Sequence, residues 1–346
     1  MRTSDQGRQG PAAMQNGAGR RQTENNRSAG RGGKKKGNRL RVFVQLCFTA
    51  LTNGYAAGFA NTTIYAGDLK HFCVPGLSCY SCPGAFGACP LGSLQAVLGS
   101  RNFNFSFYIV GFLMAVGALM GRFVCGWLCP FGLVQDLLYR IPFVKKFRRL
   151  PGDRWLRYLK YVILVGFVIV LPMTVVDIIG QGSPWFCKYI CPSGTLMAGI
   201  PLVAGDPGLQ EAAGGLFLWK VAVLAVLVLL SVVVYRPFCR YLCPLGAMYG
   251  VFNPVSLCRL QVDRDICTKC GVCQKTCGMD IPVWEKPASV ECIRCGDCVK
   301  ACPHGAIRLT GPADLIRRGG AVGNAGTSGA VESSADSVGG SVGDRH

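Results

Sequence analysis

The chain has 346 residues, of which 50% are hydrophobic, and it combines a mean hydropathy of +0.31 with a formal net charge of +19 at pH 7. This composition is too apolar for an ordinary soluble domain. The basic residues gather at the ends of apolar runs, which argues against a nucleic-acid-binding protein. No histidine lies within an apolar run, which excludes haem held by histidines between membrane helices.

In chain order, residues 1–38 are rich in Gly, Arg, Gln and Asn and are predicted to form a disordered basic arm. Four apolar runs of about the ~20 residues that cross a bilayer follow, at 41–64, 104–124, 157–179 and 215–236. Residues 311–346 are rich in Gly, Ser and Ala and are predicted to be a disordered tail. The sequence therefore predicts a mainly α-helical, polytopic membrane bundle over 39–258, with four spans built as repeated two-helix units.

The distribution of Lys and Arg predicts the orientation of this bundle. Eleven lie before residue 42 and eight within 140–160, against two within 61–103 and one within 180–214. Because segments rich in Lys and Arg stay on the cytoplasmic side, both termini are expected in the cytoplasm of a cell with a bacterial-type inner membrane. Membrane lipid is then one partner of the chain.

A short motif, C-P-x-G, recurs near the ends of the apolar runs. Its four copies begin at Cys89, Cys129, Cys191 and Cys243. In the last three copies, a further cysteine stands four positions earlier, at Cys125, Cys187 and Cys239. Proline suits the first turn of a helix, so each motif is expected to place a thiolate at a helix N-terminus, where negative charge is stabilised.

Sidedness divides these cysteines into two sets of four, the number that one [4Fe–4S] cluster requires. The inner set is Cys125, Cys129, Cys239 and Cys243. The outer set predicted from the repeat is Cys82, Cys89, Cys187 and Cys191. Cys73 and Cys79 remain for a disulfide or for alternative ligation. The competing interpretation is that the outer cysteines form only disulfides and that the inner ones are reduced packing residues.

Two successive runs of the form C-x2-C-x2-C-x3-C follow the bundle. They comprise Cys267, Cys270, Cys273 and Cys277, and then Cys292, Cys295, Cys298 and Cys302. In two-cluster ferredoxins the first three cysteines of each run bind one cluster with the last cysteine of the other run. The spacing therefore predicts one [4Fe–4S] cluster on Cys267, Cys270, Cys273 and Cys302, and another on Cys292, Cys295, Cys298 and Cys277.

These runs predict a cytoplasmic α+β domain of the bacterial ferredoxin type over 259–310. Structural zinc would need only two separated cysteine pairs, and a disulfide framework would suit a small secreted domain. One departure concerns the turn after each run, because Gly278 rather than proline follows Cys277, whereas Pro303 follows Cys302.

Together, Cys125-Gly-Trp-Leu-Cys129-Pro130, Cys239-Arg-Tyr-Leu-Cys243-Pro244 and the two ferredoxin runs resemble the membrane-bound ferredoxin-type proteins of the NapH and NosR group over about 41–310. The resemblance implies quinol oxidation, or delivery of electrons across the inner membrane to a reductase. The additional cysteines within 73–89 and at Cys187 and Cys191 fit a looser set of related 4Fe-4S membrane proteins better.

The sequence thus predicts an iron–sulfur electron-transfer subunit rather than a stand-alone enzyme. It would connect a cytoplasmic or quinone-pool partner with a redox protein at the other face, and its clusters would divide the ~30 Å bilayer. The alternatives are a quinol dehydrogenase subunit and a redox-sensing or maturation protein. For a quinol site, Asp136 and Asp177 are candidate proton acceptors, although Asp136 could simply pair with Arg140. No catalytic residue is assigned.

Overall fold

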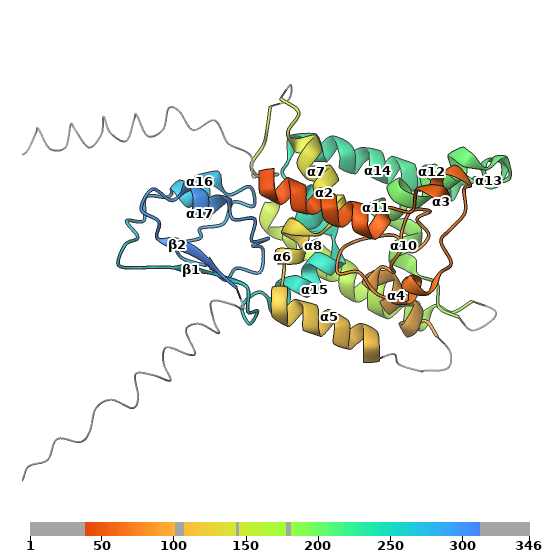
Figure 1. Cartoon of the computed structure of the whole chain (residues 1–346), viewed down its shortest axis with the longest axis horizontal. Coiled ribbons are helices and arrows are strands. Elements are labelled where there is room, and N and C mark those ends of the chain that lie inside the picture. Colours follow the sequence, from red (N-terminus) through yellow and green to blue (C-terminus); the bar gives the residue numbers. More distant parts are fainter. Residues whose placement is uncertain (1–38, 101–106, 143–144, 178–180, 312–346) are drawn as a thin grey trace, which may run out of the picture. The chain divides into compact units, whose positions relative to one another are not determined.

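The computed structural model describes residues 39–100, 107–142, 145–177 and 181–311 (Figure 1). The predicted basic arm, and the predicted tail beyond residue 311, lie outside the described residues. Over 39–258 the described chain is mainly helical. Its α-helices are α2 (Arg39–Asn53), α3 (Ala56–Ala60), α4 (Pro90–Leu98), α5 (Phe107–Met120), α6 (Phe123–Trp127), α7 (Pro130–Tyr139), α8 (Asp153–Ile163), α9 (Leu171–Thr174), α10 (Trp185–Tyr189), α11 (Pro192–Gly194), α12 (Ile200–Gly205), α13 (Pro207–Ala212), α14 (Gly215–Val233) and α15 (Pro244–Phe252).

Shorter helical segments of other types join these helices. A 3₁₀ turn covers Asp68–His71, and π-helical segments cover Leu164–Val170, Thr195–Gly199 and Phe238–Leu242. The first π segment lies between α8 and α9 and makes them one continuous helical stretch. The last one carries Cys239, and π turns of this kind are frequent at functional sites.

Two described helical stretches are long and apolar enough to cross a membrane, Asp153–Thr174 and Gly215–Val233. They coincide with the third and fourth predicted spans. The first predicted span is represented by α2, whose 15 residues extend about 22 Å at 1.5 Å per residue, less than the ~30 Å of bilayer hydrocarbon. The second is represented by the 14-residue α5, which begins next to undescribed residues. The described residues thus contain two of the four predicted spans.

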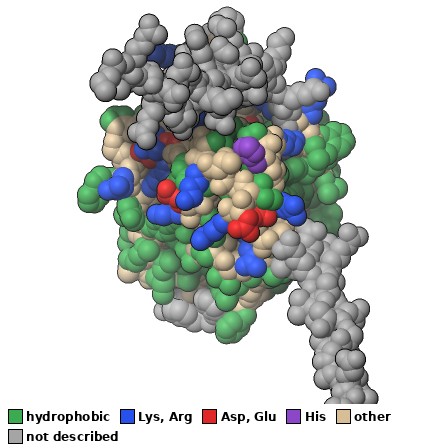
Figure 2. All heavy atoms as spheres, turned by 90° about the vertical axis from the view of Figure 1, so that its left-hand side faces the viewer, with side chains coloured by type: hydrophobic (Ala, Val, Ile, Leu, Met, Phe, Trp, Pro, Cys, Tyr) green, Lys and Arg blue, Asp and Glu red, His purple; other side chains and the backbone are tan. Residues whose placement is uncertain are grey.

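Apolar side chains cover the outward faces of both long stretches. Val162 is 63% exposed, Leu218 71% and Leu229 68%. Large exposed apolar surfaces are typical of contact with lipid or with another protein. By contrast, Figure 2 shows Lys, Arg, Asp and Glu side chains near the centre of the face that the ferredoxin-like residues occupy, with hydrophobic side chains toward its rim.

The ferredoxin-like residues form two short strands and two short helices. Strands β1 (Arg259–Val262) and β2 (Ile307–Thr310) pair antiparallel, with Arg259 opposite Thr310 and Val262 opposite Ile307. Helices α16 (Val272–Thr276) and α17 (Asp297–Ala301) lie side by side (Figure 1).

The two cysteine loops of this region repeat each other's backbone. Lys269 and Arg294 stand at the same place in the two loops, and each has φ 53°. Gly271 and Gly296 follow with φ 73° and 80° and immediately precede α16 and α17. Glycine is favoured at such left-handed positions because it has no Cβ, so the glycine after the second cysteine of each run has a structural reason.

One hydrophobic core connects the helices to the ferredoxin-like region. It includes Leu91, Phe131 and Phe238 from the helices and Ile293 and Ile307 from the ferredoxin-like region. The ferredoxin-like region is therefore held on the helices by buried contacts.

Candidate iron–sulfur centres

The eight cysteines of the ferredoxin runs surround two separate cavities. The first cavity is lined by Cys267, Cys270, Cys273 and Cys302, the first ferredoxin site. The second is lined by Cys277, Cys292, Cys295 and Cys298, the second ferredoxin site. Each loop contributes three cysteines to its own cavity, and the last cysteine of each run crosses to the other cavity. This is the exchange that the spacing predicts, and four thiols around one cavity suit a cubic cluster.

The crossing cysteines adopt the same backbone conformation although different residues follow them. Cys277 has φ −68° and ψ 116°, and Cys302 has φ −73° and ψ 113°. A Cβ added at Gly278 would lie 2.4 Å from the ring of Tyr235. Glycine stands where the other run has proline because this turn packs directly on a side chain of the helical region.

Burial makes the thiols of the second ferredoxin site poor acids in the metal-free chain. It raises the pKa of Cys298 to about 12 and also raises the pKa of Cys277, the latter against hydrogen bonds from the amides of Met279, Asp280 and Ile281. Because iron binds thiolates, loading this site must release protons. The amides around Cys277 are suited to the negative charge that remains on the sulfur.

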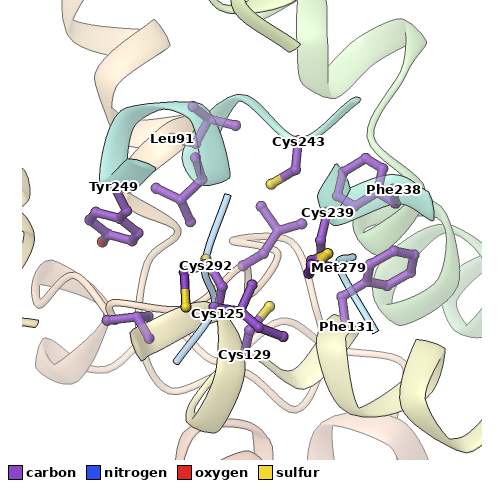
Figure 3. Packing of buried hydrophobic residues seen from close by; sticks show 14 of the residues in the cluster. Leu91, Cys125, Cys129, Phe131, Phe238, Cys239, Cys243, Tyr249, Met279 and Cys292 are labelled. Carbon is purple, nitrogen blue, oxygen red and sulfur yellow. The ribbon is translucent and has the colours of Figure 1, made fainter. Parts of the chain in front are cut away.

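The inner set of cysteines converges within the helical region. The inner site comprises Cys125 of α6, Cys129 at the start of α7, Cys239 of the last π segment and Cys243 at the start of α15. All four are buried, and the Cys243 sulfur lies within electrostatic range of the other three. Figure 3 shows the four side chains around a shared space.

The glycine of two C-P-x-G motifs has a defined role. The amide of Gly246 donates to the sulfur of Cys243 at 3.3 Å, and the amide of Gly194 donates to Cys191 at 3.4 Å. The side chains of Cys89 and Cys129 make no such capping bond. All four motif cysteines nevertheless stand directly before a helix that begins with the motif's proline, as the helix-terminus argument predicts.

Gln135, which the sequence analysis did not single out, also serves the inner site. Its fully buried side chain donates from Nε2 to the sulfur of Cys239 at 3.2 Å, and its Oε1 accepts from the amide of Phe238 at 3.2 Å. The signal that could have identified it is its position three residues after Gly132 of the motif, which places the two residues on the same face of α7.

Three of the four cysteines of the predicted outer set lie near one another. The sulfur of Cys187 lies within electrostatic range of Cys191, Cys89 and Cys79. Cys82 packs in a small buried cluster with Ala85 and Ala198, against which Cys79 also packs. The place of Cys82 in the outer set stays a prediction.

Disulfides play no part in the described arrangement. All twenty cysteines lie in the described part of the chain, and each is a free thiol, including Cys73 and Cys79. The thiol of Cys73 contacts the Ser93 hydroxyl at 3.9 Å. Among the described residues, no group of three or more His, Cys, Asp or Glu side chains is arranged to hold a single metal ion. A cubic cluster differs from a single ion because each thiolate binds a different iron of the core.

The inner site lies directly against the second ferredoxin site. A Cβ added at Gly126 would come within 2.3 Å of the backbone oxygen of Ile293, so the two backbones touch. Trp127 donates from Nε1 to the backbone oxygen of Arg294 at 3.0 Å. Both contacts join residues flanked by Cys125 and Cys129 to residues flanked by Cys292 and Cys295.

Comparisons with known proteins agree with this chemistry. A family model described as "4Fe-4S binding domain" matches residues 105–151, 159–205 and 216–258, and a second model with the same description matches 290–308. No solved structure matches.

Three relatives illustrate the range of similar proteins. An uncharacterized protein of Methanocaldococcus jannaschii is 30% identical over 199 residues, which cover 56% of this chain and 65% of the relative. The putative electron transport protein YccM of Escherichia coli is 27% identical, over 56% of this chain and 52% of YccM. The ferredoxin-type protein NapH of Escherichia coli is 27% identical, over 64% of this chain and 74% of NapH. The chain therefore matches between about half and three quarters of the length of these relatives.

The chain carries 4Fe-4S binding domains and is similar to the ferredoxin-type proteins of the NapH and NosR group. The resemblance predicted from the sequence is thereby confirmed, and the comparisons support an iron–sulfur electron-transfer role.

Two buried ion networks support the centres of this ferredoxin-type protein. Asp136 pairs with Arg236 at 2.5 Å and with Arg41 at 2.9 Å, and Arg236 also donates to the backbone oxygen of Cys125. Glu291 pairs with Arg122 at 2.9 Å and with Lys160. The first network holds α6 and α7 beside the inner site, and the second fastens the ferredoxin-like region to α8.

The candidate proton acceptors for a quinol site are placed unequally. Burial acts to raise the pKa of Asp136, but the charges of Arg236 and Arg41 and a hydrogen bond from Arg236 outweigh it and hold the pKa below its ordinary value. Asp136 is therefore an ionised structural partner of two arginines, and the ion pair predicted with Arg140 is replaced by these two. Asp177 is exposed and accepts a hydrogen bond from Ser183 at 3.1 Å.

Proposed function

We propose that this chain is a membrane electron relay in which the first ferredoxin site, the second ferredoxin site and the inner site each hold one [4Fe–4S] cluster. Such clusters supply one-electron reduction and oxidation when bound. Residues 259–310 would form the cytoplasmic module and residues 39–258 the membrane domain, with four spans and both termini in the cytoplasm. The electrons would pass between a cytoplasmic or quinone-pool partner and a redox protein at the other face.

The observation that carries this proposal is the direct succession of the cysteine sets. The two ferredoxin sites exchange their fourth cysteines, so each site includes a residue from the other run. The second ferredoxin site touches the inner site through Ile293 and Gly126. Ile293 and the inner cysteines belong to one buried core.

The core continues past the inner site toward the outer cysteines. A Cβ added at Gly76 would lie 3.4 Å from the Cα of Cys129, and the carbonyl of the next residue, Leu77, accepts from the hydroxyl of Ser193 at 3.1 Å. Ser193 stands two residues after Cys191. Tyr249, which is fully buried, lies within electrostatic range of Cys125 and Cys89. These contacts connect the inner site to the cysteines beyond it.

The protein's own groups would stabilise the charge that the relay holds. Arg122 and Arg236, both 0% exposed, lie within electrostatic range of Cys125 and Cys239. Buried cations beside a cluster with four thiolates offset its negative charge, and hydrogen bonds and burial set its reduction potential. The residues that surround the inner site are thus arranged to retain an anionic group in an apolar region.

The relay can be tested in sealed vesicles that contain the whole chain, prepared anaerobically. Reduced bacterial ferredoxin outside serves as donor and cytochrome c trapped inside serves as acceptor, because neither protein crosses lipid. We expect the wild-type chain to reduce the trapped cytochrome c, and a Cys129→Ala, Cys243→Ala double variant to fall to the rate of vesicles without protein. The Cys47→Ala variant is the matched control, since Cys47 is exposed on α2 and belongs to none of the sites.

Two outcomes would contradict the relay. Undiminished cytochrome reduction by the double variant would show that electrons bypass the inner site. If the wild-type chain, with its ferredoxin sites loaded, transfers no electrons to the trapped cytochrome c in either orientation of insertion, the chain carries electrons on one side of the membrane only.

A further inference from the structure

We propose that Cys79, Cys89, Cys187 and Cys191 form a fourth [4Fe–4S] site, the distal site, and that Gln95 is a positioning residue that donates a hydrogen bond to Cys187. The inference extends the proposed relay by one centre. It assigns the fourth ligand to a cysteine of the long loop before α4 and replaces Cys82 in the predicted outer set.

The distal site repeats the internal construction of the inner site. Gln95 stands six residues after Cys89, as Gln135 does after Cys129. The Nε2 atom of Gln95 donates to the sulfur of Cys187 at 3.3 Å, and its Oε1 accepts from the amide of Phe186 at 3.1 Å.

The corresponding distances at the inner site are 3.2 Å from Gln135 to Cys239 and 3.2 Å to the amide of Phe238. Both glutamines are buried, at 0% and 1% exposure. Each buried glutamine makes the same two hydrogen bonds, one to a cysteine sulfur and one from a backbone amide, at equivalent positions. This repetition indicates that the two glutamines serve two equivalent centres.

Two sulfurs of the distal site accept hydrogen bonds. Cys191 accepts from the amide of Gly194 at 3.4 Å, and Cys187 accepts from Gln95 at 3.3 Å. Thiols are weak hydrogen-bond acceptors, whereas thiolates are strong ones, so donors aimed at these sulfurs suit bound thiolates.

Two lysines provide the positive charge that such a site requires. Lys220 of α14 lies within electrostatic range of Cys79 and Cys191, and Lys70 lies within range of Cys79. Lys220 stands within a stretch that is long and apolar enough to cross a membrane. A lysine in such a helix is costly unless it has an anionic partner, and the distal site supplies one.

The fourth ligand is Cys79 because of where the loop places the available cysteines. A Cβ at Gly194 would lie 3.5 Å from the sulfur of Cys79 and 3.8 Å from that of Cys191, so these two sulfurs border the same motif. Cys82 is 0% exposed and packs with Ala85 and Ala198 in a cluster that Cys79 borders. Cys73 contacts Ser93 instead.

The test is the iron and acid-labile sulfide content of the full chain after anaerobic reconstitution. We expect about sixteen iron atoms per wild-type chain, four for each of four cubes. Cys79→Ala should lose about four iron atoms and the same amount of sulfide, and Cys187→Ala should lose the same cluster. Cys82→Ala, three residues away in the same loop, is the matched control and should keep the wild-type content.

A second measurement addresses Gln95 and does not depend on the iron count. Hydrogen bonds to cluster sulfurs favour the reduced, more negative state, so Gln95→Leu should lower the midpoint potential of one cluster in a redox titration followed by electron paramagnetic resonance, with iron content unchanged. Gln135→Leu should lower the potential of a different cluster.

The inference is overturned if Cys79→Ala retains the wild-type iron content, if Cys82→Ala loses iron instead, or if the wild-type chain binds about twelve atoms or fewer. Unchanged potentials in Gln95→Leu would remove the positioning role. All of these readings concern cluster binding, so a failure of transfer in vesicles with four clusters present would refute the relay and leave the distal site standing.

Discussion

Replacing Asp136 with alanine is expected to lower the free energy of unfolding by about 3–5 kcal/mol, because it leaves two buried cations without their shared partner. Arg236 is 0% exposed and Arg41 is 6% exposed, and both bond to this carboxylate. The loss should be visible as a lower midpoint of denaturant unfolding, and also as incomplete iron loading of the inner site, since Arg236 bonds to the backbone of Cys125.

A surface ion pair of the same kind provides the matched control. Arg149 pairs with Asp280, but its side chain is 57% exposed. Exposed pairs contribute about 0–1 kcal/mol, so Arg149→Gln should change the unfolding midpoint little. Equal midpoints for the two variants would show that the Asp136 network does not stabilise the bundle.

The same network gives a pH dependence of defined sign. The pKa of Asp136 is held below its ordinary value of 3.8, chiefly by the two arginines acting against burial. A depressed pKa contributes stability that is fully present above the ordinary value and is lost as the pH falls through the folded-state value. Wild-type protein should therefore lose stability in acid more steeply than Asp136→Asn, whose amide does not titrate in this range.

The sequence was most informative where the chemistry is local. The ferredoxin cysteines lie within two short runs, and spacing alone fixes which thiols can face one cavity. The C-P-x-G motif is equally local, because Pro244 and Gly246 define the turn that offers an amide to Cys243. The same few residues place a cysteine before a helix that begins with proline at four positions.

Contacts made over long distances in the chain were less predictable. The loop of residues 61–89 has little regular structure, so counting residues back from Cys89 favoured Cys82, whereas the folded loop places Cys79 beside Cys191. The sequence offered Arg140, on the same helix, as an alternative partner for Asp136, but its partners are Arg41 and Arg236, which lie about a hundred residues away on either side. Helix spacing predicts neighbours on one helix and says nothing of charges that other elements bring.

The apolar runs also predicted longer helices than the structure contains. The first run, 41–64, includes Thr52, Asn53 and Gly54, and α2 ends at Asn53. Hydropathy averages over such polar residues, and it cannot show that the chain then turns into a loop. The two stretches that do reach spanning length are the ones without an internal break of this kind.

Placing a methyl group at Gly126 is expected to slow electron transfer between the second ferredoxin site and the inner site several-fold. The added Cβ would lie 2.3 Å from the backbone oxygen of Ile293, closer than two such atoms can approach, so α6 and the loop of residues 292–295 must separate. Overpacking of this kind costs about 1–3 kcal/mol. Alanine is otherwise favoured over glycine in a helix by roughly 0.5–1 kcal/mol, so any loss must come from the contact with Ile293.

Gly111→Ala in α5 is the matched control, because an added Cβ there meets no atom within 4 Å and gains the same helix propensity. The measurement is the rate at which reduced ferredoxin, mixed rapidly with oxidised protein, reduces the inner-site cluster, followed by freeze-quenched electron paramagnetic resonance. Gly126→Ala should bind the wild-type amount of iron and reduce its two ferredoxin clusters at the wild-type rate, with only the later step delayed, and Gly126→Val should delay it further. If both variants reduce the inner site as fast as Gly111→Ala does, the contact between Gly126 and Ile293 is not the route that electrons take.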